Sequence, residues 1–348
     1  MMILSQNLLL HGKNIVNKIV IFLLSFFIVL SAQEKEDTYQ LGQGLQVGSL
    51  PIYVGGYFSV EYAHTKDVTV YSVDDLAFQS YGNYEKFSYM AELEFKELYV
   101  KTKVGDRAFT HKDEHLYLER FYMDYTFNEN YMIRVGKFNS PIGYWNLVPI
   151  NVLRDTSSHP ITSDILFPQF TTGALATYTS YNTEEIKVNV TLQNNTDLDD
   201  NYNNYKIDKH YGIGLTYTQD NLSFKINGGL FEKIPEYFAR EKLYYMLLAL
   251  EYDNDDFKIM SEIGSQKSNN EFTTDYAAYL QGLYRLNEKH NLILRAESFK
   301  TKLTPQAQHI GILGYTYRPI YPVAIKAEYQ LHSTSRDNEL LLSFSMMF

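Results

Sequence analysis

The 348-residue chain contains no cysteine, a single tryptophan and only 9 prolines. Without cysteine it can form no disulfide framework, carry out no thiol chemistry and offer no lipid attachment site of the lipoprotein type. Beyond residue 32 it also lacks any apolar run of the roughly 20 residues that a membrane-spanning helix needs. These absences exclude a helical membrane protein. They leave a transmembrane β-barrel open, because only every second residue of its strands must be apolar.

Positive charge is scarce as well. The chain has 31 Lys and Arg against 41 Asp and Glu, a net charge of −10, which disfavours a nucleic-acid partner because such a partner requires a basic face. Residues 1–32 contain Lys13 and Lys18 but no acid, followed by an apolar run that ends in small residues. This pattern is typical of a secretory signal peptide, with an uncleaved signal anchor as the alternative.

The remainder of the chain is expected to divide into two parts. Residues 33–50 are predicted to form a short periplasmic N-terminal segment, and residues 51–348 the membrane domain. Aromatic residues are abundant, with 31 Tyr and 21 Phe. Such residues favour strands and gather at membrane interfaces. An aromatic-rich soluble β-protein fits these counts equally well, so the pattern along the chain must decide.

Strand-like runs repeat through the whole of 51–348. Within 321–331, for example, Ile325 and Tyr329 alternate with Lys326 and Glu328. A lysine in a strand is costly against lipid and tolerated against water, so the charged face is expected to line a lumen. The prediction is an all-β fold, a transmembrane antiparallel β-barrel of about 16 strands. The predicted strands are 51–63, 68–82, 86–104, 113–127, 131–139, 169–180, 184–194, 208–219, 222–231, 241–254, 257–267, 273–286, 290–300, 306–318, 321–331 and 338–348.

One connection is unusually long. Residues 140–168 separate the fifth and sixth predicted strands and contain four prolines. Structureless connections of this length are uncommon in compact folds and usually functional. We expect this third long loop to fold into the lumen and narrow it, with Arg154 and Asp155 as the best candidates for the narrowest point. An equally weighted alternative is that these two residues form a salt bridge that anchors the loop.

The inferred lumen faces carry charges of both signs. Paired acids such as Glu92 and Glu94 could act as an acid–base pair or bind calcium, but polar lining is the simpler interpretation. The predicted pore-lining residues are Glu92, Glu94, Arg120, Asp124, Arg134, Lys187, Lys225, Lys258, Glu262, Arg295, Glu297, Lys326 and Glu328.

Residues 111–115 read His-Lys-Asp-Glu-His, the spacing found in some zinc peptidases. That chemistry requires a helix to bring both histidines and the glutamate around one metal. The stretch has no apolar helical face and precedes a strand pattern, so we interpret it as a solvated outer loop. No metal site, cofactor or catalytic residue is predicted.

Three segments resemble the phosphate-selective porin O and P family of Gram-negative bacteria: 117–125 (YLERFYMDY), 135–138 (VGKF) and 140–146 (SPIGYWN). The resemblance implies a sixteen-stranded barrel, usually trimeric, whose third loop forms a constriction, and it adds Tyr144 and Trp145 to the predicted constriction. Phosphate-selective members line their pores with a dense ladder of arginine and lysine. The mixed charges here depart from that pattern, so phosphate selectivity is not carried over.

The sequence therefore predicts a porin of the bacterial outer membrane. It would be a homotrimer in contact with outer-membrane lipid, and it would let small hydrophilic solutes diffuse through a water-filled channel without any chemical step. Charges at the narrowest point would set the ion preference. The alternatives are an uptake channel specific for a siderophore, an organic acid or phosphate and, less favoured, a barrel that serves as scaffold for adhesion or enzymatic activity.

Overall fold

The computed structural model describes residues 39–234, 241–268, 272–333 and 338–348. The predicted signal peptide, 1–32, lies outside the described residues. Among the helices of the described part, none combines the length and the apolar character needed to cross a membrane.

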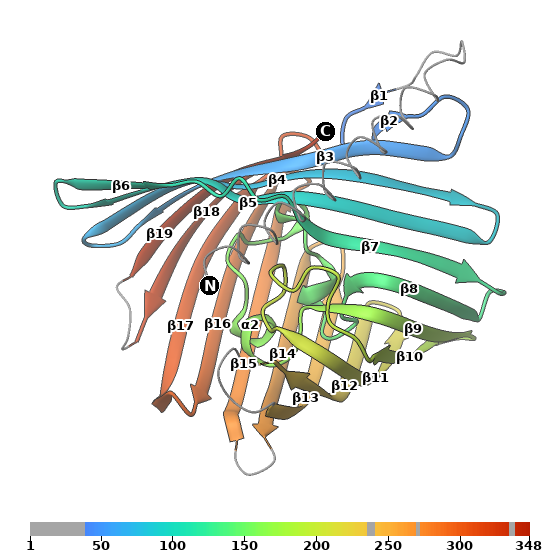
Figure 1. Cartoon of the computed structure of the whole chain (residues 1–348). Helices are drawn as coiled ribbons and strands as arrows, with labels where there is room; N and C mark the ends of the chain where they lie inside the picture. Colours follow the sequence, from blue (N-terminus) through green and yellow to red (C-terminus); the bar gives the residue numbers. More distant parts are fainter. Residues whose placement is uncertain (1–38, 235–240, 269–271, 334–337) are drawn as a thin grey trace, which may run out of the picture.

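Sixteen long strands form one antiparallel sheet, in which each strand pairs with the next along the chain (Figure 1). β19 pairs with β3 through eight residue pairs from Leu340 to Met347, which closes the sheet into a ring. The prediction of an all-β, sixteen-stranded barrel is confirmed. The strands are β3 (Ile52–His64), β4 (Val68–Tyr84), β5 (Phe87–Val104), β7 (Tyr117–Thr126), β8 (Tyr131–Asn139), β9 (Phe170–Tyr181), β10 (Glu185–Gln193), β11 (Ile207–Gln219), β12 (Leu222–Lys233), β13 (Glu241–Asp253), β14 (Phe257–Ser268), β15 (Phe272–Asn287), β16 (His290–Thr301), β17 (Thr304–Tyr317), β18 (Val323–His332) and β19 (Glu339–Met347).

Three short strands were not anticipated. β1 (Tyr39–Gln40) and β2 (Gly44–Gln46) form a small hairpin that pairs with β3. β6 (Arg107–His111) folds back and pairs with the C-terminal end of β5. As a result, the strand predicted over 113–127 begins only at Tyr117.

The two faces of the barrel differ as the alternation requires. Large apolar side chains point outward on the strands and are well exposed, including Leu294 at 66%, Leu313 at 62% and Ile213 at 61%. Their neighbours on the other face are buried and polar, such as Arg295 at 1% and Lys326 at 2% exposure. The outer face therefore suits lipid, and the ionisable groups of the strands are turned inward.

The register of the ladder shifts at several places, and two of these β-bulges, on β4 and β7, each add an acidic residue. On β4, Ser59 of β3 pairs with Asp75 while the next pair joins Val60 to Val73, so Asp74 is an extra residue. On β7, Glu92 of β5 pairs with Arg120 and the next pair skips over Glu119. A bulge redirects the side chains around it, so that two consecutive residues can face the interior.

The two long connections that pack against the polar face are 140–169 and 194–206. The first contains the short helical turns η1 (Trp145–Leu147) and η2 (Asn151–Leu153) and the helix α2 (Ile161–Ile165). α2 contacts β14 and β15, and η2 contacts β3, β18 and β19. Both connections are linked to the strands by the hydrogen bonds described below.

The outward face of β16 provides a test of membrane placement. Leu294→Lys, near the middle of the strand, should destabilise the folded barrel in lipid by about 2–4 kcal/mol, whereas the matched change Leu292→Lys, nearer the start of the strand, should cost less, about 0–1 kcal/mol. Denaturant titration in lipid vesicles measures both values. Equal effects of the two substitutions would contradict the assignment of this face to lipid.

Candidate functional site

The connection 140–169 is hydrogen-bonded to several strands of the barrel, namely β12, β14, β16 and β18. On β18, the Lys326 ammonium donates to the backbone carbonyl of Asn151 at 2.5 Å and to its side-chain Oδ1 at 2.9 Å. The carboxylate of Glu328 accepts hydrogen bonds from the backbone N–H of Ser157 and from the hydroxyl of Ser158. Two strand charges thus serve as partners for backbone groups of the connection, which need a partner when they are buried.

Glu262 on β14 holds the first part of the connection. Its Oε1 accepts hydrogen bonds from the backbone N–H groups of Tyr144 (2.7 Å) and Trp145 (3.2 Å), and its Oε2 accepts one from the Thr162 hydroxyl (2.9 Å). Lys225 on β12 donates to the carbonyl of Gly143 at 2.6 Å. Lys225 also lies 4.4 Å from the centre of the Tyr144 ring, a distance suited to a cation–π contact.

Arg295 and Glu297 on β16 form an ion pair at 2.8 Å that also contacts the connection. The Arg295 guanidinium donates to the hydroxyls of Thr156 and Ser158, each at 2.7 Å. Glu297 accepts from the backbone N–H of Ile161 at 2.9 Å. Six predicted pore-lining residues are therefore hydrogen-bonded to the connection: Lys225, Glu262, Arg295, Glu297, Lys326 and Glu328.

The remaining predicted lining residues pair with each other or with nearby groups on the strands. Arg120 pairs with Glu92, and Arg134 forms a two-fold contact with Asp124 at 2.7 and 2.8 Å. Lys187 pairs with Glu185 at 2.9 Å and Lys258 with Glu251 at 3.2 Å. Glu94 accepts from the hydroxyl of Tyr57 on β3 at 3.2 Å, and also from Tyr202 of the connection 194–206.

The second connection, 194–206, packs against the first and against the wall. Lys137 on β8 donates to the carbonyls of Asp199 (2.7 Å) and Tyr202 (3.1 Å). The Tyr202 hydroxyl donates to Glu94 at 2.5 Å. Burial, together with the nearby carboxylates of Glu119 and Glu94, raises the pKa of Tyr202 well above its usual value, so its phenol keeps the proton that it donates.

The side-chain amides of 194–206 complete the link between the two connections. Asn204 donates to the carbonyls of Asp164 (3.0 Å) and Phe167 (2.9 Å), and Asn203 donates to that of Phe170 at 3.1 Å. No residue of this connection is among the predicted site residues. The run of amide side chains in it is the signal that it satisfies buried backbone groups elsewhere.

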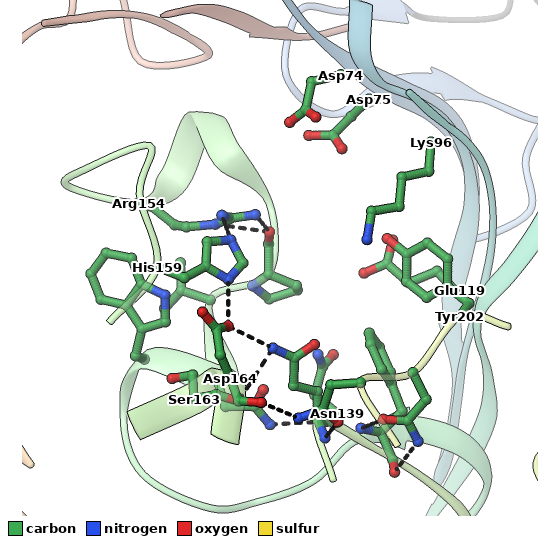
Figure 2. Close-up of a pocket in the computed structure, with 18 of the residues that line it drawn as sticks. Asp74, Asp75, Lys96, Glu119, Asn139, Arg154, His159, Ser163, Asp164 and Tyr202 are labelled. Atoms are coloured by element: carbon green, nitrogen blue, oxygen red, sulfur yellow. Dashed lines mark hydrogen bonds and ion pairs between the residues drawn. The ribbon is translucent and has the colours of Figure 1, made fainter. Parts of the chain in front are cut away.

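Between these connections and the wall lies a cavity of about 490 Å³ (Figure 2). Acidic residues of the strands lie on the wall, together with Lys96, while Arg154, His159, Ser163 and Asp164 come from the connection 140–169. The acidic wall, as the term is used below, consists of Glu61 on β3, Asp74 and Asp75 on β4, and Glu119 on β7.

The bulges explain how this acidic wall arises. Asp74 and Asp75 are consecutive yet both line the cavity, because Asp74 is the extra residue on β4. Glu119 is the extra residue on β7 and is 2% exposed; its Oε2 accepts from the Tyr57 hydroxyl at 3.0 Å. The regular alternation used in the sequence analysis cannot place Asp74 and Glu119 inside, and neither was predicted.

Arg154 is the charged residue of the connection that lines the opposite side of the cavity. Its Nε donates to the Pro149 carbonyl at 2.9 Å, and its Nη1 contacts Nε2 of His159. Burial, followed by the positive charge of Arg154, holds the pKa of His159 well below its usual value. His159 is therefore neutral near pH 7, and its Nε2 can accept the hydrogen bond from Arg154.

Asp164 lies beside His159, with Oδ1 3.8 Å from Nδ1 of the imidazole. Burial and the neighbouring Glu297 carboxylate raise the pKa of Asp164 to about 6. Of the four residues predicted for the constriction, Arg154 and Trp145 line the cavity. Tyr144 and Asp155 are not among its lining residues; Tyr144 is bonded to Ser223 at 2.7 Å, and the Asp155 carbonyl accepts from Thr316 at 2.7 Å.

The histidines of 111–115 do not resemble a zinc site. His111 ends β6, and the Asp113 carboxylate accepts from the Tyr117 hydroxyl at 2.6 Å and from the backbone N–H of His115 at 2.9 Å. Within the described ranges, no group of three or more His, Cys, Asp or Glu residues is placed to hold a metal ion.

The role of Glu262 gives a direct test of how the connection is held. Glu262→Ala removes the acceptor for two backbone N–H groups, and each buried donor left unpaired costs about 1–3 kcal/mol. Amide hydrogen exchange over 143–162 should therefore accelerate. The matched change Glu251→Ala breaks only the ion pair to Lys258 and should leave this segment protected. Unchanged exchange in the Glu262 variant would show that the connection is held by other contacts.

Comparison with known proteins places this architecture among porins. Residues 57–340 match the family described as Putative beta-barrel porin-2, OmpL-like. Comparison with curated protein sequences gives no significant match.

Several solved structures share the fold at low sequence identity. OmpT of Vibrio cholerae is 11% identical with a TM-score of 0.60, covering 90% of this chain and 100% of that one. An anion-selective porin from Comamonas acidovorans is 10% identical with a TM-score of 0.60, covering 85% and 99%. Salmonella typhi OmpF, in complex with daunomycin, is 9% identical with a TM-score of 0.60, covering 90% and 100%. Identities this low show the fold alone.

The family match spans most of the barrel and confirms the prediction of a porin, a channel for passive diffusion in the bacterial outer membrane. The matching family is not the phosphate-selective one that the motifs at 117–146 resemble. The chain belongs to the Putative beta-barrel porin-2, OmpL-like family.

Proposed function

We propose that solutes crossing this porin pass through the cavity bounded by Arg154 and the acidic wall, and that this passage is the constriction of the channel. The observation that carries the proposal is the set of hydrogen bonds from Glu262, Lys326 and Glu328 to the connection 140–169. A segment fixed to the polar face of two strands, β14 and β18, that lie four positions apart around the ring would narrow the bore. The connection 194–206 would narrow it further from the side of Glu94.

The charges around the cavity favour a preference for cations. Its lining includes five carboxyl groups, on the acidic wall and Asp164, but only Lys96 and Arg154 as permanent cations. The sign of the charge at the narrowest point sets ion preference. Three other basic residues of the strands, Lys225, Arg295 and Lys326, do not add to this charge at the cavity, because they donate to backbone or hydroxyl groups of the connection.

Phosphate-specific uptake is the alternative suggested by the resemblance of residues 117–146. It would need several free cations at the constriction. The lining of this cavity contains only Lys96 and Arg154 as permanent cations, and Arg154 already donates to Pro149 and His159. We also propose that the barrel is a homotrimer, as the resemblance implies, and that it carries out no catalysis. Stepwise, unsaturable conductance in a planar lipid bilayer would support a general porin. Block by phosphate at micromolar concentration would support the phosphate-specific alternative.

Arg154 should influence ion selectivity directly. Arg154→Gln removes one positive charge from the passage and should raise the cation-to-anion permeability ratio by about threefold, the scale of a 0.6 kcal/mol interaction with a partly screened charge. Reversal potentials in a salt gradient measure this ratio. Arg154→Lys keeps the charge and should leave the ratio close to that of the wild type. If both variants match the wild type, Arg154 does not lie at the constriction.

Asp164 should make selectivity depend on pH. Its pKa of about 6 means that it is mostly ionised at pH 8 and mostly neutral at pH 5. Lowering the pH therefore removes a negative charge and should shift the permeability ratio toward anions. The difference between the wild type and Asp164→Asn, measured as reversal potential against pH, should have its midpoint near pH 6 and vanish at pH 5. A constant difference from pH 5 to pH 8 would exclude this titration.

A further inference from the structure

We propose that the same cavity is a binding site for small zwitterionic solutes of the amino-acid or short-peptide class, with the solute ammonium held by the acidic wall and its carboxylate held by hydrogen-bond donors on the connection 140–169. This inference rests on the proposed passage of solutes through the cavity. A simple constriction would only narrow the channel, whereas a binding site should also retain one class of solute.

The wall side is arranged to receive a cation. The bulge on β4 brings the side chains of Asp74 and Asp75 to the same cavity. Asp75 uses Oδ2 to accept from the Ser59 hydroxyl at 2.9 Å, and Glu61 uses Oε1 to accept from Asn151 at 3.2 Å. Each carboxylate has further acceptor sites, because an ionised carboxylate can accept about four hydrogen bonds. The wall therefore has more acceptors than the protein occupies.

Lys96 lies on the same wall, opposite Asp75 in the strand pairing. Its ammonium is 5.5 Å from the centre of the Tyr202 ring and is exposed to the cavity (Figure 2). One lysine faces four carboxyl groups on this wall, so acceptors remain for an incoming ammonium.

The opposite side of the cavity offers donors that the protein leaves unused. Ser163 is 1% exposed and Trp145 is 5% exposed, and both line the cavity. The Ser163 hydroxyl and the indole Nε1–H of Trp145 have no hydrogen-bond partner among the described residues. Buried polar groups are nearly always paired, so two unpaired groups on residues that border one cavity point to a polar group that arrives with the solute.

These donors suit a carboxylate. An indole N–H can only donate, and a serine hydroxyl readily donates to an anion. Arg154 adds a positive charge on the same side. Asp164 would oppose an anion there, but it accepts from Gln169 at 3.3 Å and lies beside His159. A solute with separated charges matches both sides at once, whereas a simple anion meets the acidic wall and a simple cation leaves the donors unpaired.

The size of the cavity agrees with this class of ligand. Sites for small molecules commonly have volumes of about 300–1,000 Å³, and this cavity has about 490 Å³. It can therefore hold a dipeptide while remaining part of a passage.

The test uses block of single-channel current in planar bilayers by three probes of similar size. Glycylglycine is zwitterionic, N-acetylglycylglycine is anionic and glycylglycinamide is cationic. Glycylglycine should block at a concentration about tenfold lower than either of the others, because only it makes both sets of charge-assisted contacts. Equal block by the three probes, or no block by glycylglycine in a conducting channel, overturns the binding site while the proposed channel stands.

Variants assign the two ends of the solute. Asp74→Asn with Asp75→Asn should weaken block by glycylglycine and glycylglycinamide, and leave block by the anionic probe unchanged or stronger. Ser163→Ala should weaken block by glycylglycine and the anionic probe only. Asp255→Asn, on the turn after β13, is the matched control and should change none of the three. If the double substitution Asp74→Asn with Asp75→Asn prevents folding, Ser163→Ala and the three probes on the wild type still test the binding site. Block that is insensitive to Ser163→Ala overturns the assignment of the carboxylate.

Discussion

The structure depends on one constraint: a strand that crosses a lipid bilayer must find partners for all of its backbone N–H and C=O groups within the protein. An open sheet would leave two edges unpaired. Here the ladder between β19 and β3 removes both edges, and each of the sixteen long strands has a neighbour on either side. Ring closure in turn fixes an inside and an outside, and the alternation of residues then sorts apolar side chains toward lipid and polar ones toward the interior.

The ionisable residues of the interior do more than line a wall. Lys225, Glu262, Arg295 and Lys326 are bonded to backbone or hydroxyl groups of the connection 140–169. Buried charges are tolerated when they are hydrogen-bonded, and a long irregular segment needs partners for its own backbone groups. The charged side chains and the backbone groups of the connection therefore provide partners for each other. For this reason, charges that the sequence pattern assigns to the pore lining hold the connection 140–169 in the structure.

Glu61, Asp75 and Lys96 face the cavity from paired strand positions, but several of the other charges that line it come from irregular positions. Asp74 and Glu119 occupy the extra positions of two β-bulges, and Arg154 and Asp164 lie in the connection. Part of the irregular backbone therefore lies where the function is proposed. The regular strands provide a rigid ring, and the bulges and the two connections determine which side chains the solute meets.

The sequence alone determined the fold class, the number of long strands and the inward direction of most charges, because period-two alternation is a local property that survives without knowledge of contacts. Lys326 and Glu328 were placed on the correct face in this way. Asp74 and Glu119 were missed, although acids at positions where alternation predicts lipid are a signal of a bulge. Only the tertiary structure decided which charges meet. The contact between Ser158 and Glu328 joins residues 170 positions apart, and such pairing depends on ring closure and on the path of the connection, which leave no periodic trace in the sequence.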